Sequence, residues 1–122
     1  MPEFVPDISA GLAAGNHFLK GYLEACEFTD QEQWGDKVTG FSDQFIEIAE
    51  TDCATFYGTH SHMWANEPDY NDERAGNDFW YSRNGHGTGF WDRDLQHKDK
   101  LHRESKQFGS VDSYVGDDGK VY

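Results

Sequence analysis

The chain has 122 residues, and 23 acidic against 10 basic residues give it a formal net charge of −13. A length of this order predicts one domain, residues 1–122. Aromatic residues make up 16% of the chain, which is enough for a small core and argues against simple disorder. The charge excludes the usual DNA, RNA and anionic-lipid binders, because these present a positive surface. No stretch approaches the ~20 apolar residues of a membrane span, so we expect a soluble protein without a membrane partner.

The negative charge is confined to one part of the chain. Residues 1–73 contain 15 acids and only two bases, Lys20 and Lys37, whereas residues 74–122 contain eight acids and eight bases. Such asymmetry points to a charged partner. The alternative is that acidity only keeps the protein soluble, for which a net charge of magnitude ~2–8 is typical of a small domain.

The acidic part is expected to be helical. Residues 1–8 form an extended arm, and an apolar stripe through Leu19 and Leu23 predicts a helix from near Ser9 to about residue 27. Residues 29–41 are a polar connection. A second helix starts with Ser42 as its N-cap. Asp43, Glu47 and Glu50 lie on the face opposite its apolar residues, while Asp52 falls among the apolar positions and is expected to cap or pair with another group.

The charge-balanced part is expected to contain two hairpins. Residues 79–83 and 88–93 are rich in aromatics and flank Asn84-Gly85, a strong hairpin signal. Asp94 caps a helix over 95–108, and residues 111–115 and 120–122 form a second hairpin. The expected fold class is therefore α+β, with acidic N-terminal helices packed on a small antiparallel sheet built from two hairpins and a further helix.

Cysteine and histidine give no metal or cofactor signal. Cys26 and Cys53 are expected to be buried free thiols rather than a disulfide. His60 and His62 are close in sequence, yet no zinc-site spacing accompanies them. We expect neither a metal nor a cofactor.

The densest pattern runs from Asp78 to Arg93 and has the form D-F-W-x-x-R-N-G-H-G-x-G-F-W-D-R. With Ala75-Gly76 before it and the stretch from Phe108 to Tyr122 after it, this segment resembles a family of small acidic proteins of tailed bacteriophages. The resemblance covers about residues 74–122. It implies a phage origin and a location in the cytoplasm of the bacterial host cell, and it implies no mechanism.

A catalytic interpretation of this segment would use Arg83, His86 and Asp92, with His86 as general base. No nucleophile stands beside His86 in the sequence, and the glycines do not match a phosphate loop. We favour a structural role, in which the glycines make the turn and Arg83 pairs with Asp92 across the hairpin. The residues concerned are Phe79, Trp80, Arg83, Asn84, Gly85, His86, Gly87, Phe90, Trp91 and Asp92.

The leading hypothesis is a DNA mimic that is not an enzyme. Carboxylates three and four residues apart on a helix lie ~5–6 Å apart, which approximates a row of phosphates. A host DNA-binding protein with a basic groove would be the partner, for example DNA gyrase or another topoisomerase, a restriction or CRISPR effector, a nucleoid protein or RNA polymerase. The candidate acids are Glu24, Glu27, Asp30, Glu32, Asp36, Asp43, Glu47, Glu50, Glu67, Asp69, Asp72 and Glu73.

Two alternatives stay open. The chain is then either a small enzyme or ligand-binding protein that uses Arg83, His86 and Asp92, or an accessory phage protein whose acidity serves only solubility.

A homodimer would lengthen the acidic surface of a mimic, with Trp34 or Trp64 as exposed aromatics at its interface.

Overall fold

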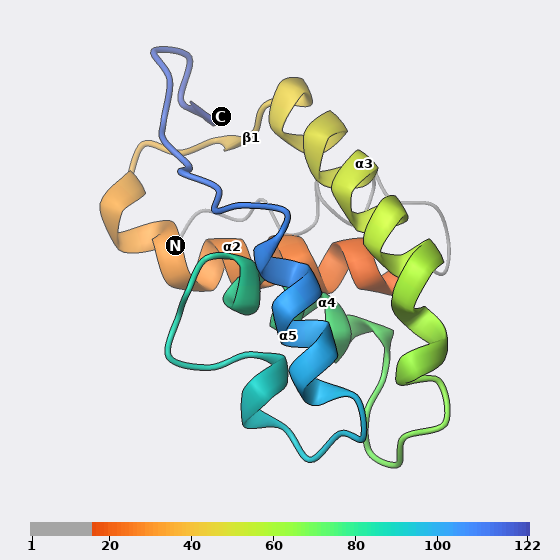
Figure 1. The fold of residues 1–122 in the computed structure, drawn as a ribbon. Helices are drawn as coiled ribbons and strands as arrows, with labels where there is room; N and C mark the ends of the chain where they lie inside the picture. Colours follow the sequence, from red (N-terminus) through yellow and green to blue (C-terminus); the bar gives the residue numbers. More distant parts are fainter. Residues whose placement is uncertain (1–15) are drawn as a thin grey trace.

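The computed structural model describes residues 16–122, which form a mostly helical fold (Figure 1). Within this range the α-helices are α2 (His17–Trp34), α3 (Asp43–His60), α4 (Asp72–Arg83) and α5 (Lys98–Lys106). Two short 3-10 helices, η1 (Ser61–Met63) and η2 (Phe90–Asp92), lie in the connections. The strands β1 (Gly40–Phe41) and β2 (Lys120–Val121) have two residues each and pair in parallel. The expectation of an α+β fold with an antiparallel sheet of two hairpins is therefore wrong.

The first expected hairpin is replaced by α4. Asn71 caps this helix, since its side chain accepts a hydrogen bond from the Arg74 amide at 2.8 Å. Asp72 and Glu73 occupy the first turn, where the helix dipole favours negative charge. The aromatic run that resembled a strand instead buries Phe79 and Trp80 on the helix, because packing overrides local strand preference.

Helices α2 and α4 pack with unusually close backbones. A Cβ atom at Gly76 would overlap the carbonyl oxygen of Phe18, and one at Gly21 would overlap the carbonyl oxygen of Glu73. Asn77 strengthens this contact, because its side chain donates to the Gly21 carbonyl at 2.6 Å. Glycine is required at both positions by space rather than by backbone conformation.

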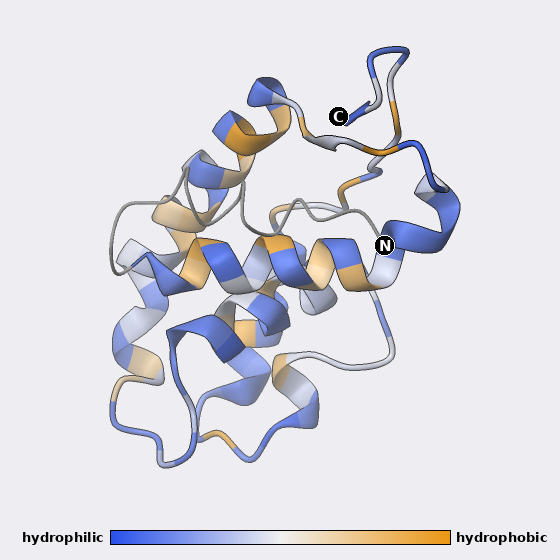
Figure 2. Ribbon diagram, turned by 180° about the vertical axis from the view of Figure 1, so that it is seen from behind, coloured by the Kyte–Doolittle hydropathy of each residue, from blue (hydrophilic) through white to orange (hydrophobic). Residues whose placement is uncertain are grey.

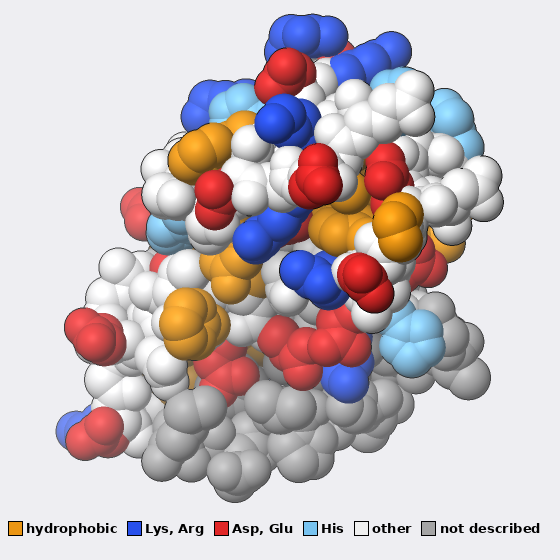
Figure 3. Space-filling view, turned by 90° about the horizontal axis from the view of Figure 1, so that it is seen from below, with side chains coloured by type: hydrophobic (Ala, Val, Ile, Leu, Met, Phe, Trp, Pro, Cys, Tyr) orange, Lys and Arg blue, Asp and Glu red, His pale blue; other side chains and the backbone are white. Residues whose placement is uncertain are grey.

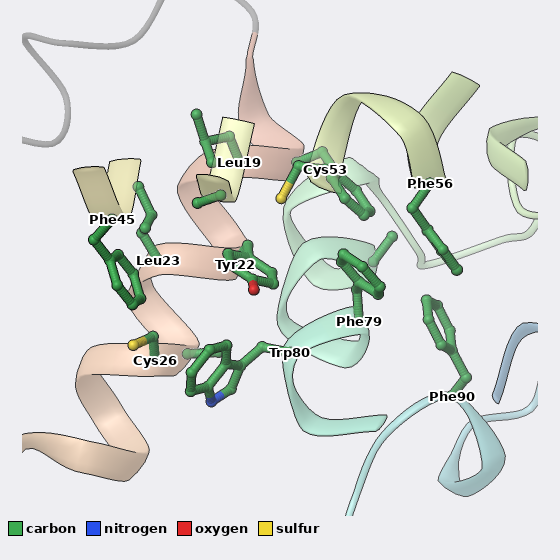
Figure 4. Packing of buried hydrophobic residues seen from close by; sticks show 14 of the residues in the cluster. Leu19, Tyr22, Leu23, Cys26, Phe45, Cys53, Phe56, Phe79, Trp80 and Phe90 are labelled. Atoms are coloured by element: carbon green, nitrogen blue, oxygen red, sulfur yellow. The ribbon is translucent and has the colours of Figure 1, made fainter. Parts of the chain in front are cut away.

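An aromatic cluster fills the space between α2, α3, α4 and η2 (Figure 4). The Phe56 and Phe79 rings stack with their centres 4.3 Å apart, and Phe90 stacks on Phe56 at 5.8 Å. Tyr22 meets the edge of Trp80 at 5.3 Å. Such pairs add to the burial of apolar area, so the aromatic residues of the expected hairpin form the core.

The start of α3 agrees with the sequence. The Ser42 hydroxyl accepts a hydrogen bond from the Phe45 amide at 3.0 Å, which confirms this residue as the N-cap. The second expected hairpin is reduced to one antiparallel bridge, Val115 with Val121, beside paired hydrogen bonds between the backbones of Tyr114 and Tyr122. Val121 also hydrogen-bonds to Ser42, so the C-terminal segment is attached to the start of α3.

Helix α2 carries hydrophobic residues alternating with hydrophilic ones along its length (Figure 2). It continues through residues 29–34, so the expected polar connection at these residues is wrong. The expected arm over residues 1–8 and the helix start near Ser9 lie outside the described residues. Cys26 and Cys53 are buried free thiols, as predicted. No helix among residues 16–122 is long and apolar enough to cross a membrane.

Candidate partner-binding surface

The structure divides the candidate mimic acids by exposure. Glu27 is buried, and the half-buried members are Glu24, Asp30, Glu67, Asp72 and Glu73. The exposed members are Glu32, Asp36, Asp43, Glu47, Glu50 and Asp69. Only an exposed carboxylate can replace a phosphate for a large partner, so the number of useful acids falls by half.

Several half-buried acids hold the fold together. Asp72 accepts hydrogen bonds from the Trp64 indole and the Tyr57 hydroxyl, both at 2.9 Å. Asp30 accepts from the Ser113 hydroxyl at 2.6 Å, and thereby ties α2 to the C-terminal segment. These carboxylates accept internal hydrogen bonds and are held in place by them.

Glu24 and Glu73 form a carboxyl pair where α2 crosses α4. Burial, followed by the charge of Glu73 and a hydrogen bond to it, raises the pKa of Glu24. Lys20 approaches Glu73 at 3.7 Å and partly compensates the pair. Both carboxyls are half-buried and face each other and Lys20, so they are less available to a partner than the exposed acids.

The exposed acids Asp43, Glu47 and Glu50 form what we call the α3 stripe. All three lie on the first half of α3, and their spacing of four and three residues places them on one face. The stripe spans about 10 Å along the helix axis. Beyond the stripe come Thr51 and Thr55, which carry no charge. Their hydroxyls donate to the backbone carbonyl oxygens four residues earlier.

Exposed acids from the C-terminal segment lie beside the stripe, and none of them is among the candidates predicted from the sequence. The backbone of β2 holds this segment against β1 and Ser42, at the start of α3. The Tyr122 hydroxyl donates to Asp118 at 2.8 Å, and this hydrogen bond, followed by burial, raises the pKa of Tyr122. The turn from Gly116 to Gly119, which contains two adjacent aspartates, was the available sequence signal for these acids. It was not used, because residues 74–122 have no net charge.

We call the combined set the acidic surface. It joins exposed carboxylates from two segments far apart in the chain and from the loop that precedes β1, namely Asp36, Asp43, Glu47, Glu50, Asp112, Asp117 and Asp118. Within residues 16–122, no ion pair uses any of them. Lys37 and Lys120 are the basic residues in the same segments.

One carboxylate of this surface, Asp118, is held in its charged form by hydrogen bonds. The Lys120 amide donates to Asp118 at 3.0 Å and lowers the pKa of this carboxyl, with the Tyr122 hydroxyl adding to the effect. On the face seen from below, acidic and basic side chains are interspersed over the described part of the molecule (Figure 3).

The motif residue Arg83 has a structural position that the sequence did not predict. Its guanidinium contacts Asp52 at 2.9 Å and the Tyr22 hydroxyl at 3.0 Å. It also donates to the carbonyl oxygens of Phe108 at 2.9 Å and Gly109 at 2.8 Å. The expected pairing of Arg83 with Asp92 is wrong, and the partner that Asp52 required is Arg83.

The rest of the motif connects α4 to η2. Asn84 follows α4 as its C-cap, and its side-chain oxygen accepts from the Val111 amide at 2.6 Å. Gly85 and Gly89 have φ values of 71° and 144°, which favour glycine. Ser82 completes the connection, because its hydroxyl accepts from the Phe90 amide at 3.1 Å. The loop expected at residues 84–87 exists, but it leaves a helix rather than a strand.

The catalytic combination is not assembled. Arg83 is buried in the contacts above, whereas Asp92 is exposed and accepts from the Thr88 hydroxyl at 3.1 Å. His86 is half-buried, with its ring against the edge of Tyr81. Within residues 16–122 no hydroxyl or thiol hydrogen-bonds to the His86 ring. Trp91 is exposed, unlike the other tryptophans.

The aromatics expected at a dimer interface are buried. Trp34 donates to the Ser113 hydroxyl at 2.9 Å and Trp64 donates to Asp72, so both indoles complete their hydrogen bonding inside the chain. The expectation that they are exposed is wrong. In the part of the chain that the structure describes, no group of three or more His, Cys, Asp or Glu is arranged to hold a metal ion.

Comparisons with protein-family models, with curated proteins and with solved structures find no match to this chain.

Proposed function

We propose that this chain is a phage-encoded DNA mimic, which binds a host DNA-binding protein through the acidic surface. One observation carries the proposal: the C-terminal segment is held against the start of α3, and the exposed carboxylates of these two segments have no ion pairs among residues 16–122. Like charges at one place repel one another and destabilise a folded chain. A partner with a basic groove would offset that repulsion.

The geometry suits a short section of duplex. The α3 stripe alone, at about 10 Å, covers little more than one ~7 Å phosphate step. Asp112, Asp117 and Asp118 add exposed carboxylates from a second segment, whose backbone pairs with β1 and with Ser42 at the start of α3. Electrostatic steering of this kind raises association rates and weakens with salt.

The test compares two triple variants with the same change in net charge. The first reverses the stripe (Asp43→Lys, Glu47→Lys, Glu50→Lys), and the second reverses exposed acids outside the acidic surface (Asp92→Lys, Asp94→Lys, Asp99→Lys). Binding to purified DNA gyrase, RNA polymerase, a nucleoid protein, and restriction and CRISPR effectors is measured at low and moderate salt.

The proposal expects the native chain to bind at least one of these targets with an affinity that falls as salt rises. The stripe variant should bind about tenfold more weakly or worse, and the control variant should bind nearly as the native chain does. Circular dichroism checks that both variants keep their helices. Equal binding by both variants, or an affinity indifferent to salt, contradicts the proposal and favours an accessory protein whose acidity serves solubility.

A further inference from the structure

An apolar groove lies beside the acidic surface, between the first half of α3 and the C-terminal segment. Its volume is about 100 Å³. Phe45 and Ala49 form a buried floor. Gln44 and Ile48 of α3 form one wall, and residues 111, 112 and 122 form the other. The volume suits one side chain rather than a small-molecule ligand, since ligand pockets usually hold ~300–1,000 Å³.

The groove has an exposed apolar edge. Ile48 is 53% exposed, and it lies on α3 between the exposed Glu47 and the buried Ala49. Tyr114 is 59% exposed, and its ring stacks on Tyr122 with the centres 5.8 Å apart. Aliphatic and aromatic side chains left in water at one place are typical of a contact surface when polar groups surround them.

The surroundings of the groove are negative. Asp112 lines it, Asp43 directly precedes the lining residue Gln44 on α3, and Asp118 accepts a hydrogen bond from the Tyr122 hydroxyl at 2.8 Å. Among the described residues, no Lys or Arg lines it. Tyrosine faces next to carboxylates favour a guanidinium, which combines ion pairing with stacking on a ring.

We infer that this groove receives one large apolar side chain of the partner, from a segment in which arginines flank it. The inference rests on the proposed function and specifies the partner's chemistry. DNA-binding proteins that bend the duplex insert an apolar wedge between base steps while basic residues hold the phosphates. The groove would take the wedge, and Asp43, Asp112 and Asp118 would take the arginines.

The probe is the heptapeptide Arg-Gly-Arg-Leu-Arg-Gly-Arg, titrated into the full ¹⁵N-labelled chain at low salt. A second peptide has alanine in place of leucine. The inference expects the largest amide shifts at Gln44, Ile48 and Val111. The leucine peptide should bind about fivefold more tightly than the alanine peptide, since part of a leucine side chain leaves water.

Ile48→Gln should remove that preference, so that both peptides bind alike. Phe28→Gln is the matched control, because Phe28 is an exposed apolar residue of a different helix, 71% exposed; it should leave the preference intact. Both substitutions are at exposed positions, so neither is expected to unfold the chain.

Three results overturn the proposed groove. Equal affinity of the native chain for both peptides means that only charge is recognised, and amide shifts located away from α3 and residues 111–122 mean that the site is elsewhere. Absence of any peptide binding at low salt is the third. The proposed function is judged separately by the stripe variant on purified targets, so the groove can fail while mimicry stands.

Discussion

Replacement of the buried arginine, Arg83→Met, should strongly destabilise the chain. Methionine keeps much of the apolar stem but loses the ion pair with Asp52 and the hydrogen bonds to Tyr22 and to the carbonyl oxygens of Phe108 and Gly109, which follow α5. Breaking a buried ion pair from one side costs about 3–5 kcal/mol. The Asp52 side chain is 26% exposed and becomes partly hydrated, which places the expected loss near the lower limit.

The loss is measured by urea denaturation followed through tryptophan fluorescence. Arg103→Met, at an exposed position of α5, is the matched control and should change the free energy of unfolding by less than about 0.5 kcal/mol. Arg83→Lys should fall between native and Arg83→Met, since lysine keeps the charge but not the fork of donors. A loss below about 1 kcal/mol for Arg83→Met would refute the network as a major source of stability.

Further predictions concern the contact between α2 and α4. Gly76→Ala should lower the free energy of unfolding by about 1–3 kcal/mol or more, because the new methyl group meets the Phe18 carbonyl. Gly58→Ala on α3 has open space around the new methyl group and should raise the free energy of unfolding by about 0.5–1 kcal/mol. Thermal unfolding of both variants measures the difference, and equal effects would contradict the close packing of α2 and α4. The pKa of Glu24 is raised above its ordinary value of 4.5, mainly by burial and then by Glu73. The protonated carboxyl therefore contributes its full stability below pH 4.5, and this contribution is lost as the pH rises through the raised pKa. Glu24→Gln should therefore be more stable than the native chain at pH 7, with an advantage that shrinks toward pH 4.5; urea titrations at both pH values measure it, and an advantage independent of pH would contradict the assignment.

Local signals predicted the parts of the fold that local chemistry decides. The Ser42 cap, the exposed face of α3 and the buried state of both cysteines follow from capping, helical spacing and hydrophobicity. The strand expected at residues 79–83 is wrong. A run of aromatic residues is compatible both with a strand and with a helix that is buried against its neighbours, so the run alone does not distinguish them. Asn71, twelve residues before Arg83, was the cap that would have identified the helix.

The candidate surface could be predicted only in part. Asp43, Glu47 and Glu50 are exposed as their spacing indicated, but Glu27 is buried and Asp72 is used by two internal donors. Those outcomes depend on how α2 and α4 pack, which no local pattern encodes.

The contribution of the C-terminal segment was also out of reach. The segment that carries Asp118 is held at the start of α3 by backbone pairing between residues about eighty positions apart, such as Thr39 with Gly119. Net charge counted along the chain therefore underestimates the charge that the fold gathers at one place.

The central claim is that the acidic surface occupies the site where a target protein holds DNA. The most direct measurement titrates fluorescent duplex DNA and this chain together on one purified DNA-binding target, such as DNA gyrase. Mimicry predicts mutual exclusion: the chain releases the DNA, its apparent affinity falls in proportion to added duplex, and the variant with Asp43, Glu47 and Glu50 reversed releases none. A ternary complex of target, DNA and chain with undiminished affinities would contradict the account.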